Sequence, residues 1–146
     1  MDWKTFYRGV FLVNVVGIVY DPKTKKILIG KRGKDEYLPE LTWCFPGGRP
    51  TYKHSLTMSL IMEIKKKTNL DVNVLDCIFA RTLPEKPEFL LIYYFCEVVE
   101  ESEKPKPMEK FEEIKWVKPT EVEKYFTTSV DPVVASFLEA LENGEI

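Results

Sequence analysis

One stretch, Trp43–Arg49 (WCFPGGR), together with the run that follows it, constrains the fold most tightly. Its aromatic start predicts a short strand over 43–45, and Pro46-Gly47-Gly48 predicts a tight turn in which a Cβ would be penalised. From Ser55 onward apolar residues recur at helical spacing, which predicts a helix with one apolar face. Those positions are Leu56, Leu60, Ile61 and Ile64. The chain is therefore predicted to be built around a strand–turn–helix unit.

The polar face of this helix carries one carboxylate, Glu63, and two lysines, Lys66 and Lys67, one turn further on. Two interpretations of the lysines remain open. In the first, their ammonium groups bind a pyrophosphate directly, in place of a metal ion. In the second, they are ordinary solvated side chains, and Glu63 pairs with Lys67 at i,i+4 spacing, which is worth only about 0.3–0.5 kcal/mol. Asn69 favours a left-handed end to the helix.

Further strands and helices are expected on both sides of this unit. Runs of β-branched and aromatic residues predict strands over 9–20, 26–32, 71–81, 89–99 and 112–117. The Asp21-Pro22 turn joins the first two strands in a hairpin, and residues 83–88 connect the third and fourth. Polar, proline-containing stretches at 33–41 and 100–110 predict exposed loops.

The C-terminal part of the chain predicts a short helix over 120–125 and a final helix over 131–142. Asp131 is a good N-cap for the final helix, and its apolar stripe would be Val133, Phe137, Leu138 and Leu141. This order of elements predicts the α+β class, with a mixed β-sheet sandwich flanked by helices and a single domain over residues 1–146.

Composition narrows the class of protein. A chain of 146 residues with 45% hydrophobic content can bury one sizeable core. The net charge of −2 gives no signature of nucleic-acid binding. No apolar run is long enough to span a membrane, and the start lacks the order of a signal peptide, so we expect a cytoplasmic protein. The abundance of Lys and Glu with no Gln is similar to that of thermophile proteins. Cys44, Cys77 and Cys96 are expected to be buried free thiols.

The glycine turn and its helix resemble the signature of the Nudix (MutT-like) family. That signature reads glycine, five residues, Glu, seven residues, Arg-Glu, an aliphatic residue, any residue, Glu-Glu, any residue, Gly and an aliphatic residue. With its first glycine at Gly48, the signature is matched by Glu63, Ile64 and Leu70. Its other slots hold His54, Met62, Lys66, Lys67 and Asn69. The resemblance extends over roughly residues 11–141 and implies the Nudix fold, an α/β/α sandwich.

The resemblance implies a hydrolase of a nucleoside diphosphate linked to another moiety. In such enzymes helix carboxylates hold Mg²⁺, which bridges pyrophosphate oxygens and activates a water. Lysine supplies no oxygen ligand, so Mg²⁺ or Mn²⁺ held by Glu63 would need other ligands. These could be the backbone carbonyl of Gly47 or Gly48, or the late acids Glu109, Glu112 and Glu113, which otherwise form a charged loop before an edge strand.

Other site residues follow from the same resemblance. Glu63 and His54 are the candidate catalytic residues. His54 has a side-chain type that can act as a base near neutral pH, and the alternative, which is the commoner case, is an exposed loop histidine without a role. Arg32, Arg49, Lys66 and Lys67 are the candidate substrate-binding residues, since they can contact phosphate. The N-terminal aromatics Trp3, Phe6 and Tyr7 either stack on a base or pack on the sheet.

A finer resemblance concerns residues 30–32 (GKR) and 46–49 (PGGR), which are similar to those of the GDP-mannose mannosyl hydrolases. It implies a sugar nucleotide as substrate. The family also implies a homodimer. Three functions therefore remain open. The first two are a hydrolase with an impaired metal site, and a catalytically inactive module that binds a nucleotide or docks a partner. The third, a weaker option, is a structural role as a dimer subunit.

Overall fold

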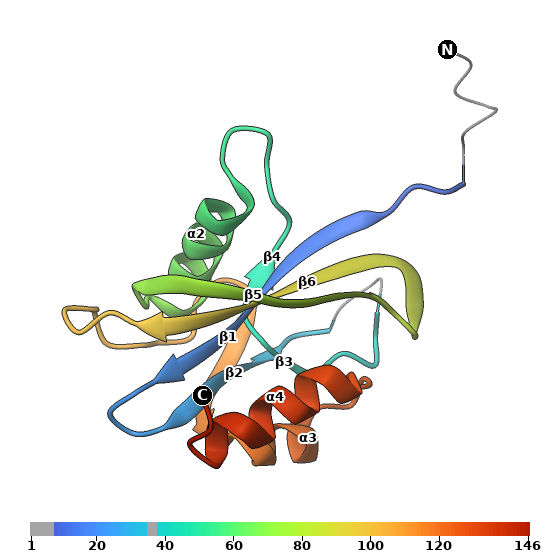
Figure 1. Cartoon of the computed structure of the whole chain (residues 1–146). Coiled ribbons are helices and arrows are strands. Elements are labelled where there is room, and N and C mark those ends of the chain that lie inside the picture. The colour runs from blue at the N-terminus through green and yellow to red at the C-terminus, as the bar shows by residue number, and fades with distance from the viewer. Residues whose placement is uncertain (1–7, 35–37) are drawn as a thin grey trace.

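The computed structural model describes residues 8–34 and 38–146 (Figure 1). These residues form a seven-stranded mixed sheet whose main path is β3-β2-β1-β6-β5, with β4 paired to β1 and β7 paired to β2. The strands are β1 (Leu12–Asp21), β2 (Lys26–Arg32), β3 (Trp43–Cys44), β4 (Gly47–Gly48), β5 (Val72–Leu83), β6 (Lys86–Val98) and β7 (Phe111–Val117). The helices are α2 (Leu56–Thr68), the 3₁₀ turn η1 (Pro119–Glu121), α3 (Val122–Tyr125) and α4 (Pro132–Glu142).

Strand β1 is the centre of the sheet. It pairs in parallel with β6 along 12–20, and antiparallel with β2 near its end and with β4 at Val15 and Val16. Its successive residues face opposite sides of the sheet, because side chains of a strand alternate in direction. Val15 and Val19 belong to one buried cluster and Ile18 to the other. Both faces of the strand are therefore covered.

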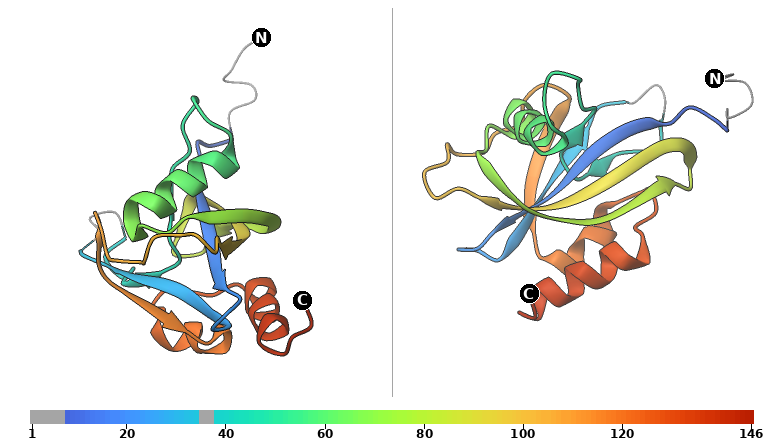
Figure 2. Two further views of the ribbon diagram at one scale, coloured as in Figure 1. Left: turned by 90° about the vertical axis from the view of Figure 1, so that its left-hand side faces the viewer. Right: turned by 45° about the horizontal axis from the view of Figure 1, so that its top comes forward.

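Two helical layers cover the sheet, as Figure 2 shows. Helix α2 packs on one face, where Leu60 and Ile64 are fully buried, and α4 packs on the other with Val134 and Leu138. Gly17 lets α2 approach closely, since a Cβ there would lie 2.8 Å from the Ile64 Cδ1 atom. The α+β class and the helix-flanked mixed sheet are confirmed. No helix among the described residues is long and apolar enough to cross a membrane.

Several details differ from the sequence predictions. Leu56 and Val133 are 40% and 46% exposed, so neither belongs to the inward face of its helix. On α4 the buried residues are Val134, Leu138 and Leu141, whose i, i+4, i+7 spacing follows the helical period, whereas Val133 is turned about 100° away. Cys77 is exposed rather than buried, because it lies between two register shifts on β5, at the end of the sheet path.

The predicted connection over 83–88 is a tighter hairpin than expected. Strand β5 continues to Leu83, β6 starts at Lys86, and these two residues face each other across the turn. Pro87 fits inside β6 because it lies next to the hairpin end, where a strand tolerates a missing backbone donor. The hairpin therefore passes the start of β1, where Leu12 pairs with Phe89, and it forms a wall of the cavity described next.

Candidate functional site

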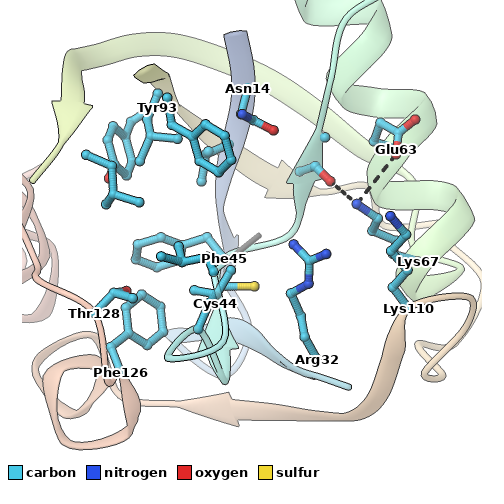
Figure 3. A pocket seen from close by; sticks show the side chains of 18 of the residues that line it. Asn14, Arg32, Cys44, Phe45, Glu63, Lys67, Tyr93, Lys110, Phe126 and Thr128 are labelled. Carbon is cyan, nitrogen blue, oxygen red and sulfur yellow. Dashed lines mark hydrogen bonds and ion pairs between the residues drawn. The ribbon is translucent and has the colours of Figure 1, made fainter. Parts of the chain in front are cut away.

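A cavity of about 880 Å³ lies between four parts of the chain (Figure 3). They are residues 32–34, which carry Arg32 and Gly33, residues 44–49, which carry Gly47, Gly48 and Arg49, strand β6, and the loop before α4. The cavity wall has two chemically different ends. At one end Figure 3 shows the basic side chains of Arg32, Lys67 and Lys110, and Lys34 and Arg49 also line the cavity. At the other end it shows the aromatic side chains of Phe45, Tyr93 and Phe126, and Phe89 also lines the cavity. The site combines segments that are far apart in the sequence.

Gly47 and Gly48 are needed because β1 and α2 lie very close to them, and not because the chain turns there. They form the short strand β4 against Val15 and Val16, and neither is among the described residues with positive φ. A Cβ on Gly47 would collide with the Val15 carbonyl oxygen. A Cβ on Gly48 would lie 2.6 Å from the Glu63 Oε2 atom. The prediction of a tight turn here is wrong, and the missing Cβ atoms instead bring the polar face of α2 onto backbone.

Lys67 lies at the contact between α2 and β4. Its Nζ donates a hydrogen bond to the Gly47 carbonyl oxygen and lies 3.6 Å from Glu63 Oε2. The side chain is only 12% exposed. Burial lowers the pKa of the ammonium group, the neighbouring Glu63 carboxylate opposes that shift, and Arg32 adds to it. The predicted pairing of Glu63 with Lys67 is confirmed, but Lys67 is not an ordinary solvated lysine.

Lys66 is different. Its Nζ lies 3.5 Å from Glu63 Oε1, and its side chain is 52% exposed. It lies with His54 and Met62 beside a small separate hollow of about 30 Å³, which Glu63 and Arg49 also line. Among the described residues His54 and Lys66 are therefore not part of the main cavity wall. The solvated interpretation fits Lys66 and not Lys67.

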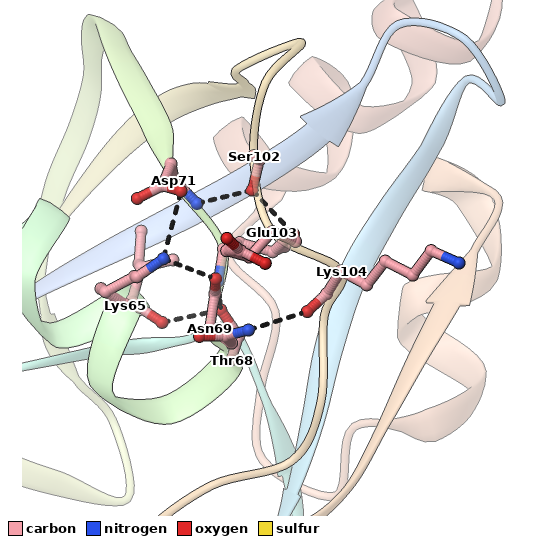
Figure 4. Close-up of polar contacts among 9 residues, drawn as sticks. Lys65, Thr68, Asn69, Asp71, Ser102, Glu103 and Lys104 are labelled. Atoms are coloured by element: carbon pink, nitrogen blue, oxygen red, sulfur yellow. Dashed lines mark hydrogen bonds and ion pairs between the residues drawn. The ribbon is translucent and has the colours of Figure 1, made fainter.

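Helix α2 is held at both ends, and this fixes the position of Lys67. Ser55 caps the start, where its Oγ accepts a hydrogen bond from the Met58 amide at 3.1 Å. Asn69 ends the helix in the left-handed conformation with φ 65°, as predicted. The Asn69 side chain then donates to the Lys104 carbonyl at 3.1 Å (Figure 4).

The segment 102–108, which we call the strap, closes the C-terminal end of α2. The amide of Met108 donates to the Lys67 carbonyl at 2.9 Å, and the amide of Lys106 donates to the Thr68 carbonyl at 3.0 Å. These bonds satisfy carbonyls that a helix end leaves without a partner. The predicted exposed loop is therefore tied to α2, and it delivers Glu109 and Lys110 to the cavity wall.

The aromatic end is organised by Phe45 and a polar clamp. The Phe45 ring packs edge to face on Tyr93 and on Phe126, with centroids 6.4 and 4.9 Å apart. Arg81 Nε donates to the Tyr93 hydroxyl at 3.2 Å, and its Nη2 donates to the Ser129 carbonyl at 2.8 Å. Burial raises the pKa of the Tyr93 hydroxyl, and Arg81 opposes that shift. The clamp holds the loop before α4 against the β5–β6 hairpin.

The acids of the site do not form a set of metal ligands. Glu63, Glu109 and Glu112 line the cavity, whereas Glu113 is an exposed residue of β7 outside its described wall. In the parts of the chain that the structure describes, no three His, Cys, Asp or Glu side chains are grouped to hold a metal ion. The Gly47 carbonyl, one of the predicted backbone ligands, already accepts from Lys67. The residues present therefore do not fit Mg²⁺ or Mn²⁺.

Several residues of the cavity wall were not predicted from the sequence. Lys110, Arg81 and the aromatic end were not singled out, although Phe89, Leu91 and Tyr93 alternate along β6 and so had to share one face. Lys110 lies in the loop immediately before β7, and loops next to strand ends commonly carry site residues. The aromatics predicted to stack a base, Trp3, Phe6 and Tyr7, lie outside the described residues.

The fold is similar to that of several solved structures. A Nudix hydrolase from Nitrosomonas europaea has a TM-score of 0.75 at 16% identity, covering 94% of this chain and 76% of that one. The MutT protein from Methanosarcina mazei Go1 has a TM-score of 0.69 at 16% identity, covering 95% and 98%. An ADP-ribose pyrophosphatase from Streptococcus suis 89-1591 has a TM-score of 0.65 at 15% identity, covering 88% and 90%. At such identities the likeness shows the fold.

Sequence comparison supplies the family. No curated protein has significant sequence similarity to this chain. The sequence profile of the NUDIX domain matches residues 10–137, which include the glycine strand, α2 and the whole sheet. Because this match covers most of the chain and the fold agrees, the protein belongs to the Nudix family.

Proposed function

We propose that this protein binds a nucleoside diphosphate linked to another moiety. The observation that carries the proposal is the two-ended cavity, which places basic side chains at one end and aromatic side chains at the other (Figure 3). A nucleotide has the same division, because its phosphates are anionic and its base is a flat ring. The volume of about 880 Å³ is in the range of small-molecule sites.

The basic end suits a diphosphate. Arg32 and Arg49 come from β2 and from the segment after β4, so they approach the cavity from different elements. Guanidinium groups bind phosphate oxygens through paired hydrogen bonds. Lys67 and Lys110 add positive charge beside them. The cavity wall holds six basic and four acidic side chains, so basic groups are in excess there although the net charge of the chain is −2.

The aromatic end suits a base. Phe45 packs edge to face on both Tyr93 and Phe126, so the three rings form a preorganised apolar wall. Stacking of a base on an aromatic side chain is worth about 1–3 kcal/mol. Asn14 and Asp131 also line the cavity and supply polar groups that can select among bases.

The choice of the second moiety extends this proposal. The family acts on small nucleotide-linked substrates, and a structure of the same fold is an ADP-ribose pyrophosphatase. We therefore propose a sugar or ribosyl group as the second moiety.

We also propose that the protein forms a homodimer. Light scattering of the purified protein measures the oligomeric state, and a monomeric mass at micromolar concentration would contradict the dimer.

Calorimetric titration tests the binding proposal. ADP, ADP-ribose, UDP-glucose and GDP-mannose are titrated into the wild-type protein and into Arg49→Ala and Lys23→Ala. We expect at least one ligand to bind, and Arg49→Ala to weaken it about tenfold because a charged phosphate contact is lost. Lys23 lies exposed in the β1–β2 turn, so its variant should bind as the wild type does. Absence of binding by all four ligands would overturn the proposal.

Hydrolysis is a second candidate function. One observation favours it, namely that Glu63, Glu109 and Glu112 line the same cavity. Phosphate release from the same four ligands and from nucleoside triphosphates is measured with and without Mg²⁺ or Mn²⁺. Turnover that Glu63→Gln abolishes would support the hydrolase. Ligand binding without turnover under all these conditions would contradict the hydrolase and leave binding as the only proposed function.

A further inference from the structure

The most unusual group in the cavity is the nearly buried ammonium of Lys67. Its Nζ lies between the Gly47 carbonyl oxygen, to which it donates, and the Glu63 Oε2 atom at 3.6 Å. Its side chain is 12% exposed, against 52% for the neighbouring Lys66. A carbonyl and a carboxylate oxygen are the ligand types that hard cations such as Mg²⁺ prefer. The oxygens that would hold a metal ion therefore already hold a cation.

The surroundings of Lys67 make this arrangement stable. Glu63 is 20% exposed, and a carboxylate with so little solvent needs a positive partner close by. An ammonium group has three N–H donors and no acceptor. One donor is used by the Gly47 carbonyl and one side faces Glu63, which leaves the third direction for a ligand in the cavity.

We propose that Lys67 is the resident cation of this site, so that the protein binds its diphosphate ligand without a metal ion. This inference rests on the proposed binding function and states how that function works. The ammonium group neutralises Glu63 and presents a positive charge to the diphosphate, beside Arg32. A divalent ion is excluded because Lys67 occupies its oxygens and repels it.

The same geometry predicts what a change of charge does. Glutamate at position 67 would stand one helical turn from Glu63 and above the Gly47 carbonyl, because the caps of α2 and the Met108 bond to the Lys67 backbone hold the helix in place. Two carboxylates and one carbonyl then face a common point. Lys67→Glu should therefore create a site for Mn²⁺, whereas Lys66→Glu, at a more exposed position, should not.

The test is a titration of Mn²⁺, followed by electron paramagnetic resonance, into wild type, Lys67→Glu and Lys66→Glu. The control variant has the same net charge and lies on the same helix, so it removes the effect of general attraction. We expect Lys67→Glu to bind Mn²⁺ at least about tenfold more tightly than either of the others. We also expect Mn²⁺ to raise the melting temperature of Lys67→Glu alone. Equal affinities of the two variants for Mn²⁺ would overturn the proposal that Lys67 is the resident cation.

A second measurement on the wild-type protein does not depend on any variant folding. The nucleotide ligand is titrated in EDTA and in Mg²⁺, and we expect the two affinities to agree within about twofold. Affinity that is lost in EDTA would overturn the proposal. The Mn²⁺ titrations contain no nucleotide, so their outcome is independent of the binding function. A gain of Mn²⁺ binding in Lys67→Glu with no nucleotide binding by the wild type would reject the proposed function while supporting the arrangement of Lys67.

Discussion

The residues that bring α2 onto β4 are two glycines with different neighbours. Gly47 has no room for a Cβ because the rigid backbone of Val15 lies against it, whereas Gly48 faces the Glu63 side chain, which can shift more easily than backbone. We expect Gly47→Ala to lower the free energy of unfolding by about 3 kcal/mol and Gly48→Ala by about 1 kcal/mol or less. Urea denaturation measures both. Equal losses would show that backbone and side-chain obstruction cost the same here.

The thiols give a second test at the scale of single residues. Cys96 is fully buried, and burial raises its pKa to about 12. Since only the thiolate is alkylated, Cys96 should stay unmodified by iodoacetamide at pH 8 while the exposed Cys77 reacts. Mass spectrometry of the peptides reads each site, and protein unfolded in urea is the positive control. Modification of native Cys96 at the rate of Cys77 would contradict its placement in the core.

At the scale of elements, the end of α2 depends on Asn69. It adopts φ 65° and its side chain donates to the Lys104 carbonyl of the strap at 3.1 Å. Asn69→Ala loses this bond and strains the backbone, so we expect a loss of about 2 kcal/mol in the free energy of unfolding. Asn69→Gly loses the same bond without the strain and should lose about 1 kcal/mol. Chemical denaturation compares them, and a larger loss for glycine would contradict the left-handed cap.

How well the sequence predicts each of these elements depends on how far apart along the chain the residues that determine it lie. Strand β2 agrees with its prediction at both ends, and the left-handed end of α2 at Asn69 was predicted, because Asn69 acts on backbone within one turn. The strap was not, since its bonds join residues about 35 positions apart in the chain. The same holds for Lys67, whose solvation is decided by Gly47 on another element.

The whole molecule is a sheet with two separate apolar layers, and its unfolding tests whether they act as one unit. Ile64 lies in the layer under α2 and Ile27 in the layer under α4, and both are fully buried. Ile64→Val and Ile27→Val should each cost about 0.5–1.5 kcal/mol. Because the sheet separates the two sites, the double variant should cost the sum of the two to within about 0.5 kcal/mol.

A single domain over residues 1–146 further requires that all four proteins unfold in one transition. Tryptophan fluorescence and far-ultraviolet circular dichroism should give coincident curves, because Trp43 and Trp116 pack against different layers. The wild type serves as the reference for both probes. Separate transitions, with the variant of one layer shifting only one of them, would mean that the layers fold independently. In that case the cavity, which draws on β2, β6 and the strap side of α2 together, would be completed only when the second layer folds.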